Sequence, residues 1–194
     1  IYPFIWILIN SFKDKGDILT NSFSLPIKSF TLDNFKSAIF GRYNVLQAYL
    51  NSFIISFSVV VLVLIITTFS SYALARYNFK GKRFVYALVI ACMMFPIFST
   101  IFPLYKMLVN FKIHGTHLGV ILPQVAGNIG FATILLTGFI QNIPKEVEES
   151  AYLDGANVFQ IMRYITVPMS KSAYSSAAIF VFLWSYNDLF LQML

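Results

Sequence analysis

Two histidines are the residues of this chain whose type and spacing most directly suggest chemistry. His114 and His117 are three positions apart, and two imidazoles at that spacing on a helix can hold a metal ion. No acid lies near them, and Cys92 is the only cysteine, which excludes an internal disulfide. We therefore interpret both histidines as ordinary loop residues, and we expect no metal, no bound cofactor and no catalytic residue in this chain.

Asp188 is the one acid inside an apolar stretch long enough to approach membrane length. Ionisable groups at membrane depth are costly and are usually functional. Because Asp188 lies near the end of its stretch, a capping or interfacial role and a contact with a transported solute both remain open. Five uncharged polar residues in the apolar stretches could have either of two roles. They could line the path of a transported solute, or they could form hydrogen bonds between packed helices: Asn51, Ser56, Ser58, Asn128 and Thr133.

Three glutamates cluster where the sequence predicts a short helix in a loop. Pro144 suits the first turn of a helix, and Glu146, Glu148 and Glu149 would complement the positive end of the helix dipole. Gly155 can adopt the left-handed conformation that ends a helix. We expect the first helix of a helix–turn–helix here.

A second helix is predicted directly after this turn. Asn157 is a suitable N-cap, and Val158, Ile161, Met162 and Ile165 recur at i, i+3, i+4 and i+7. These residues form one apolar stripe, which we expect to contact a soluble partner. An interfacial helix that rests on lipid is the alternative, but the acids of the first helix would be repelled by anionic lipid.

The composition indicates that this loop connects membrane-spanning helices. Of 194 residues, 58% are hydrophobic and 11% are charged, whereas soluble domains carry roughly 25% charge. These values exclude a disordered chain, a nucleic-acid-binding protein and an ordinary soluble enzyme. The apolar runs lack the period-two alternation of a barrel, so we predict five helical spans: 1–11 (partial), 49–73, 84–104, 119–140 and 172–192.

Charge density and chain ends refine this topology. Residues 76–83 hold four basic residues and no acid, which places that loop in the cytoplasm, and loop 141–171 then faces the same side. Pro96 and Pro103 are expected to kink the third span. Because the sequence is apolar at both ends, we expect a fragment that lacks the start of its first helix and its C-terminal helix.

The spacing within loop 141–171 resembles the EAA signature of ABC-importer membrane subunits. That signature runs Glu-Ala-Ala, three residues, Gly, nine residues, Ile-x-Leu-Pro. Here Glu149-Ser150-Ala151 is followed by three residues and Gly155, then by nine residues and Ile165-Thr166-Val167-Pro168. The spacing matches throughout, and Ser150 and Val167 are mild replacements.

Other segments are similar to the permeases of maltose-like and multiple-sugar importers. Tyr186-Asn187-Asp188 resembles their Trp-Asn-Asp/Glu segment, while Ser172 stands where such sequences often carry Pro. The remaining similar segments are Tyr72–Arg76 with Phe79–Lys82, Met93–Pro96 with Phe102–Tyr105, Gly138-Phe139, and Ile143-Pro144 with Asp154-Gly155-Ala156.

The resemblance implies an all-α, polytopic transmembrane helical bundle of the ABC type I importer membrane-domain fold, in a bacterial plasma membrane. It also implies four partners besides the lipid bilayer: a second homologous permease subunit, a cytoplasmic ATPase dimer that uses ATP, an extracytoplasmic solute-binding protein and a sugar. No nucleic acid is expected. The residues implied to couple to the ATPase are Glu149, Ser150, Ala151, Asp154, Gly155, Ala156, Ile165 and Pro168.

Three alternatives to a sugar permease differ from it in what the sequence would have to contain. A permease of the same family for an amino acid, peptide or ion differs only in its solute, which the sequence does not identify. A secondary transporter would need ionisable residues at mid-membrane, and spans 49–73, 84–104 and 119–140 contain none. A membrane enzyme would need acids beside the histidines. The sequence also lacks a phosphate-binding Gly-x-x-x-x-Gly-Lys-Ser/Thr, so ATP hydrolysis is expected in another subunit.

Overall fold

The computed structural model describes residues 1–27, 29–41 and 44–193. Helices joined by short loops account for most of these residues, which confirms the all-α prediction. The chain divides into two compact units, Ile1–Ser52 and Phe53–Leu194, and the boundary falls within one long helix.

Unit one, Ile1–Ser52, folds around a buried lysine. The Nζ of Lys13 is fully buried and donates hydrogen bonds to the carbonyl of Asn21 (2.6 Å) and to Oγ of Ser24 (3.3 Å). Asn34 donates to the carbonyl of Lys13 at 2.7 Å. These bonds tie together three short helices: α1 (Tyr2–Ser11), α2 (Lys15–Thr20) and α3 (Asp33–Phe40).

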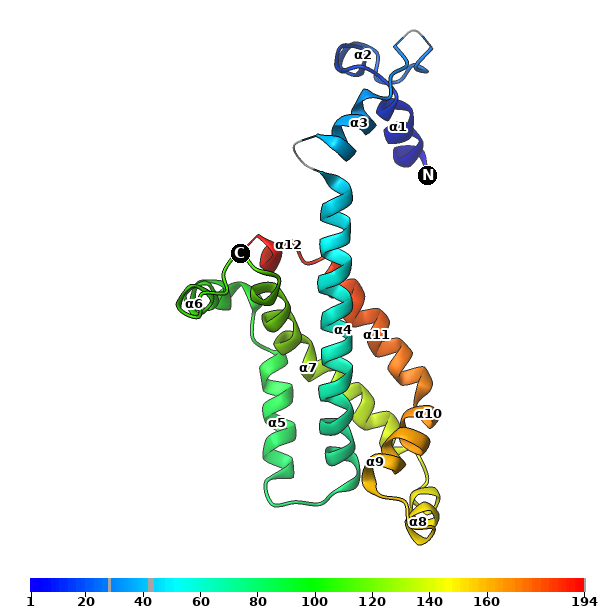
Figure 1. Cartoon of the computed structure of the whole chain (residues 1–194), viewed down its shortest axis with the longest axis vertical. Coiled ribbons are helices and arrows are strands. Elements are labelled where there is room, and N and C mark those ends of the chain that lie inside the picture. The colour runs from blue at the N-terminus through cyan, green and yellow to red at the C-terminus, as the bar shows by residue number, and fades with distance from the viewer. Residues whose placement is uncertain (28, 42–43, 194) are drawn as a thin grey trace. The chain divides into compact units, whose positions relative to one another are not determined.

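Unit two, Phe53–Leu194, contains most of the longest helix, α4 (Val45–Arg76), and all of α7 (His117–Gln141) (Figure 1). Both helices are long and apolar enough to cross a membrane, and they include the predicted spans 49–73 and 119–140. About one third of each spanning window, 33%, is buried inside the chain. The remaining surface of both helices is free to contact lipid or another subunit.

The third predicted span is broken rather than continuous. It forms α5 (Lys82–Met93) and α6 (Ile97–Asn110), and the two axes differ by 98°. The break falls at Pro96, whose backbone is extended and which cannot donate a helical hydrogen bond. Pro103, by contrast, lies within α6.

The last predicted span is also divided. α11 (Lys171–Tyr186) ends before Asn187, and the short α12 (Leu189–Gln192) follows. Asp188 is the N-cap of α12, because its Oδ1 accepts a hydrogen bond from the Leu191 amide at 3.1 Å. The capping role left open by the sequence is therefore confirmed.

An apolar core forms where α4, α7 and α11 pack together. The buried residues of this core are Ile55, Val59 and Val63 of α4, Ile121, Val125 and Ala132 of α7, and Val181 of α11. Ser185 of α11 donates a hydrogen bond to Ser56 of α4 at 3.1 Å, and Thr133 of α7 lies 3.0 Å from Ser70 of α4. Ser56 and Thr133 therefore bond between packed helices.

Candidate functional site

The predicted helix–turn–helix is present at one end of unit two (Figure 1). α8 (Lys145–Leu153) begins directly after Pro144, and Gly155 has a φ of +86°, in the left-handed region. Asn157 and Gln160 then form a capping box with reciprocal hydrogen bonds of 3.0 and 2.8 Å. The turn at Gly155 and the cap at Asn157 are confirmed.

The second helical segment continues toward α11 with one change of winding. α9 (Val158–Ile161) is followed by a π-helical turn, η1 (Met162–Thr166), and by α10 (Val167–Met169). The Val167 amide bonds back to the Met162 carbonyl, five residues earlier. Pro168 has no N–H to donate, so the wider turn lies directly before it.

The apolar stripe of this segment faces the chain's own core. Ile161 is fully buried, Met162 is 6% exposed, and Val158 packs against the same cluster. The prediction that this stripe contacts a soluble partner is therefore wrong. The helical spacing identified the apolar face, but it did not show whether that face packs on the chain's own helices or on a partner protein. The buried residues that form one cluster with Met162 come from other helices: Tyr72, Leu136, Ile140 and Ala173.

The exposed residues of the two helical segments, which we call the loop face, include a different set of apolar side chains, of which Phe159 also packs edge-on against Phe69 of α4. Leu153 is 90% exposed, Phe159 70%, Tyr164 69% and Tyr152 44%. Sequence reasoning missed them, although large apolar residues outside the stripe are a usable signal. Of the implied coupling residues, the exposed ones are Glu149, Ser150, Asp154, Gly155 and Pro168, and the half-buried ones are Ala151, Ala156 and Ile165.

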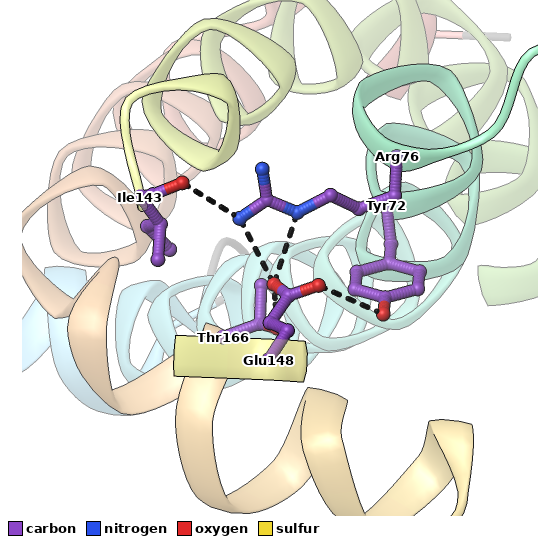
Figure 2. A network of polar contacts seen from close by, with 5 residues as sticks. All are labelled: Tyr72, Arg76, Ile143, Glu148 and Thr166. Carbon is purple, nitrogen blue, oxygen red and sulfur yellow. Dashed lines mark hydrogen bonds and ion pairs between the residues drawn. The ribbon is translucent and has the colours of Figure 1, made fainter. Parts of the chain in front are cut away.

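A buried polar network anchors the loop face to α4 (Figure 2). The Arg76 guanidinium lies 2.9 Å from Oε1 of Glu148, and Nε of Arg76 donates to the same oxygen at 3.0 Å. Tyr72 donates to Oε2 at 3.2 Å, and Thr166 donates to Oε1 at 3.3 Å. Arg76 also donates to the Ile143 carbonyl at 3.1 Å.

The two charged side chains at the centre of this network are withdrawn from solvent. The side chain of Arg76 is 7% exposed and that of Glu148 is 6% exposed. A buried ion pair is strongly destabilised when one partner is removed, because the other charge is left unpaired. The network therefore fixes α8 to the end of α4. Sequence reasoning had given Glu148 only a role at the helix dipole.

A small pocket joins this network to the surface. It has a volume of about 260 Å³, and its lining includes Arg76, Glu148, Tyr77 and the exposed Glu149. Burial raises the pKa of the Tyr77 phenol, with a hydrogen bond to Tyr152 acting in the same direction. Tyr77 is therefore neutral at physiological pH, and it adds no charge beside the ion pair.

The two histidines lie apart from this site. The ring of His114 packs edge-on against Tyr105, with 5.0 Å between ring centroids, and His117 begins α7. In residues 1–27, 29–41 and 44–193, no three His, Cys, Asp or Glu side chains gather as metal ligands would.

Comparisons with known proteins place this arrangement in context. Residues 66–192, which include Arg76 and Glu148, match the family described as binding-protein-dependent transport system inner membrane component. The chain is 35% identical to the diacetylchitobiose uptake system permease protein NgcG of Streptomyces coelicolor, over 100% of this chain and 63% of that protein. It is 31% identical to the probable starch degradation products transport system permease protein AmyC of Thermoanaerobacterium thermosulfurigenes, over 100% of this chain and 70% of that protein.

A third relative and a solved structure agree with these matches. The chain is 30% identical to the trehalose transport system permease protein SugB of Mycobacterium tuberculosis, over 100% of this chain and 69% of that protein. A crystal structure of a bacterial ABC transporter involved in the import of alginate superposes with a TM-score of 0.81 at 20% identity, over 96% of this chain and 65% of that one. This likeness shows the fold. The chain thus spans about two thirds of the length of these proteins.

Proposed function

The chain belongs to the family of binding-protein-dependent transport system inner membrane components, and from this membership we propose that it forms one half of the translocation path of an ATP-driven sugar importer. It performs no covalent chemistry itself. ATP is hydrolysed by a separate cytoplasmic ATPase dimer, and an extracytoplasmic binding protein delivers the solute. The protein acts in the bacterial plasma membrane, with loops 76–83 and 141–171 on the cytoplasmic side.

The loop face is the surface that docks the ATPase. The exposed Glu149 and Leu153 are four positions apart in α8, so a carboxylate and a large apolar side chain share one helix face, and that combination suits a protein groove better than anionic lipid. Glu149 and Leu153 supply the charged and apolar contacts. The half-buried Ala151, Ala156 and Ile165 hold the backbone of the two helices in place beneath them.

The observation that carries this proposal is the buried ion pair between Arg76 and Glu148. An ATPase that pushes on α8 can move the membrane helices only if α8 is rigidly joined to one of them. Arg76 is the last residue of α4, which is long enough to cross the membrane. The pair therefore transmits movement of the loop face to α4, and hence to the solute path.

The solute is a sugar, and a second permease subunit completes the path. Relatives over the full length of this chain are named for the uptake of diacetylchitobiose, starch degradation products and trehalose. Only 33% of the spanning window of α4 and of α7 is buried inside the chain. The uncovered surface of these helices supports a path shared between two subunits.

Uptake of labelled oligosaccharides by cells with and without the full-length gene tests the proposal. We expect uptake that requires the binding protein, is lost when the ATPase is inactivated by mutation, and persists when the proton gradient is collapsed while ATP is maintained. Uptake that follows the proton gradient and ignores the ATPase would identify a secondary transporter instead. Selective uptake of amino acids or ions would support an ATP-driven importer but would contradict the proposal that its solute is a sugar.

A further inference from the structure

A pocket outside the coupling site lies where the end of α4 meets the start of α5. Its volume is about 590 Å³, and it reaches the end of α7 at Gln141. We call it the α5 pocket. Two cations and four apolar or aromatic residues of its lining carry the argument: Lys82 and Arg83, with Leu74, Tyr86, Ala87 and Ile90. None of its lining residues is acidic.

A second pocket adjoins the first and shares its cations. It has a volume of about 320 Å³ and is formed by the loop residues Phe79 and Gly81 together with Asn78, Lys82 and Arg83. The two cations therefore line both pockets, one beside the loop residues Asn78, Phe79 and Gly81 and one beside the apolar residues of α5. Cations next to an apolar wall match a phospholipid, in which an anionic headgroup is joined to apolar chains.

The charges of both cations are available to a ligand. The ammonium of Lys82 donates to the Tyr77 carbonyl at 3.1 Å and lies 3.5 Å from Oδ1 of Asn78, which orients it while leaving one of its three N–H donors. Arg83 is exposed and forms no hydrogen bond or ion pair with the described residues. A guanidinium of this kind suits bidentate binding of a phosphate.

The position of the pocket in the chain matches the edge of a membrane. Lys82 and Arg83 occupy the first turn of α5, at the end of the basic loop 76–83 and directly before the predicted span 84–104. Tyr86 and Ile90 are 36% and 40% exposed, so the apolar wall opens to the surroundings of the helix. Basic residues beside a membrane helix attract anionic lipid.

We propose that the α5 pocket binds one anionic phospholipid, with its phosphate between Lys82 and Arg83 and an acyl chain along Tyr86, Ala87 and Ile90. Charge complementarity selects this occupant. A free phosphate would leave the apolar wall uncovered, and a neutral lipid would leave the two cations without a counter-charge. The site does not depend on which solute the protein transports.

Photocrosslinking tests this site directly. The full-length protein, purified with its partner subunits, is placed in nanodiscs of phosphatidylcholine that contain a minor fraction of phosphatidylglycerol with a photoactivatable acyl chain. We expect labelling of the peptide that holds Ala87 and Ile90, above the labelling given by phosphatidylcholine with the same chain. Lys82→Gln and Arg83→Gln should each lower this preference about fivefold, the ratio that corresponds to ~1 kcal/mol per charge.

Matched variants separate the pocket from general surface charge. Lys80→Gln removes the same charge from the same loop but lies outside both pockets, so the preference should be unchanged. Exchanging the two residues, Lys82→Arg with Arg83→Lys, should retain it. Ala87→Trp keeps both cations but fills the pocket, and it should abolish labelling at Ile90.

Two outcomes would overturn the proposal. One is equal labelling by the anionic and the neutral lipid. The other is a protein–protein crosslink from a photoreactive residue at Ala87, which would show that another segment or subunit fills the pocket. Because these experiments measure lipid binding and not uptake, their failure would leave the proposed transport function standing.

Discussion

Arg76, the last residue of α4, forms an ion pair with Glu148 of α8 over 2.9 Å, although 72 positions separate them in the chain. Glu149, the next residue, is exposed to solvent. One helical step turns a side chain by about 100°, which is enough to bury one glutamate and leave its neighbour exposed. The two carboxylates therefore have different roles, one inside the protein and one on the loop face.

We expect Glu148→Ala to lower the free energy of unfolding by about 3–5 kcal/mol, because it leaves the Arg76 guanidinium buried without a carboxylate. Thermal unfolding of the purified full-length protein in detergent measures the effect. Glu149→Ala is the matched control and should unfold at the wild-type temperature. Equal unfolding temperatures for the two variants would contradict the buried pair.

Replacing both charged residues should restore the stability that is lost when only one of them is replaced. The double variant Arg76→Met with Glu148→Leu leaves no unpaired buried charge, so it should recover most of the stability lost in Glu148→Ala. Thermal unfolding of the single and double variants side by side tests this recovery. A double variant no more stable than Glu148→Ala would show that the stability comes from the surrounding hydrogen bonds.

Gly155 should be sensitive through its backbone alone. A Cβ at this position would meet no atom within 4 Å, but φ is +86°, where a side chain costs about 1 kcal/mol and a β-branched one more. We expect Gly155→Val to leave membrane insertion and expression intact, to weaken retention of the ATPase during purification, and to abolish uptake. Gly155→Asn, which tolerates the left-handed region, is the control. Normal uptake by the valine variant would show that the turn does not set the docking geometry.

Leu153 and Ile161 should respond differently to truncation. Leu153 is 90% exposed, so Leu153→Ala should change the free energy of unfolding by less than about 0.5 kcal/mol. It should weaken retention of the ATPase by about tenfold, which equals ~1.4 kcal/mol at an interface. Ile161 is fully buried, and Ile161→Ala should cost about 2–5 kcal/mol of stability. Thermal unfolding and co-purification of the ATPase are measured on both variants. Ile161→Ala should be the less stable of the two, and Leu153→Ala should be the one with weakened ATPase retention at wild-type stability.

Asp188 can be tested for a role beyond capping. Its Oδ1 caps α12, and its Oδ2 accepts a hydrogen bond from Gln124 at 3.4 Å. Asp188→Asn keeps a side-chain cap, and we expect normal stability and normal sugar uptake. Asp188→Ala should lose about 1 kcal/mol of stability. Loss of uptake in a stable Asp188→Asn protein would instead indicate that the charge contacts the solute.

The sequence alone determined the local structure of this protein. Apolar stretches predicted α4 and α7, because backbone groups in lipid must bond within a helix. Pro144, Gly155 and Asn157 predicted where the two loop helices begin and end, because capping depends on residues only a few positions apart. The motif spacing around Gly155 also identified the family to which the chain belongs.

The tertiary structure alone decided which residues meet across the chain. Periodicity identified the stripe that contains Ile161 and Met162, but only the packing of that stripe on Tyr72 and Ile140 showed that it faces inward. Proline content likewise did not distinguish Pro96, where the third span breaks, from Pro103, which α6 accommodates.

The same limit applies to the ion pair. Nothing in the local sequence shows that Glu148, and not Glu149, forms a buried ion pair, because its partner lies at the end of another helix. Local propensities act over a few residues, whereas the choice of partner depends on how separate helices pack. For that reason the helices and their caps could be read from the sequence, and the pairing of Arg76 with Glu148 could not.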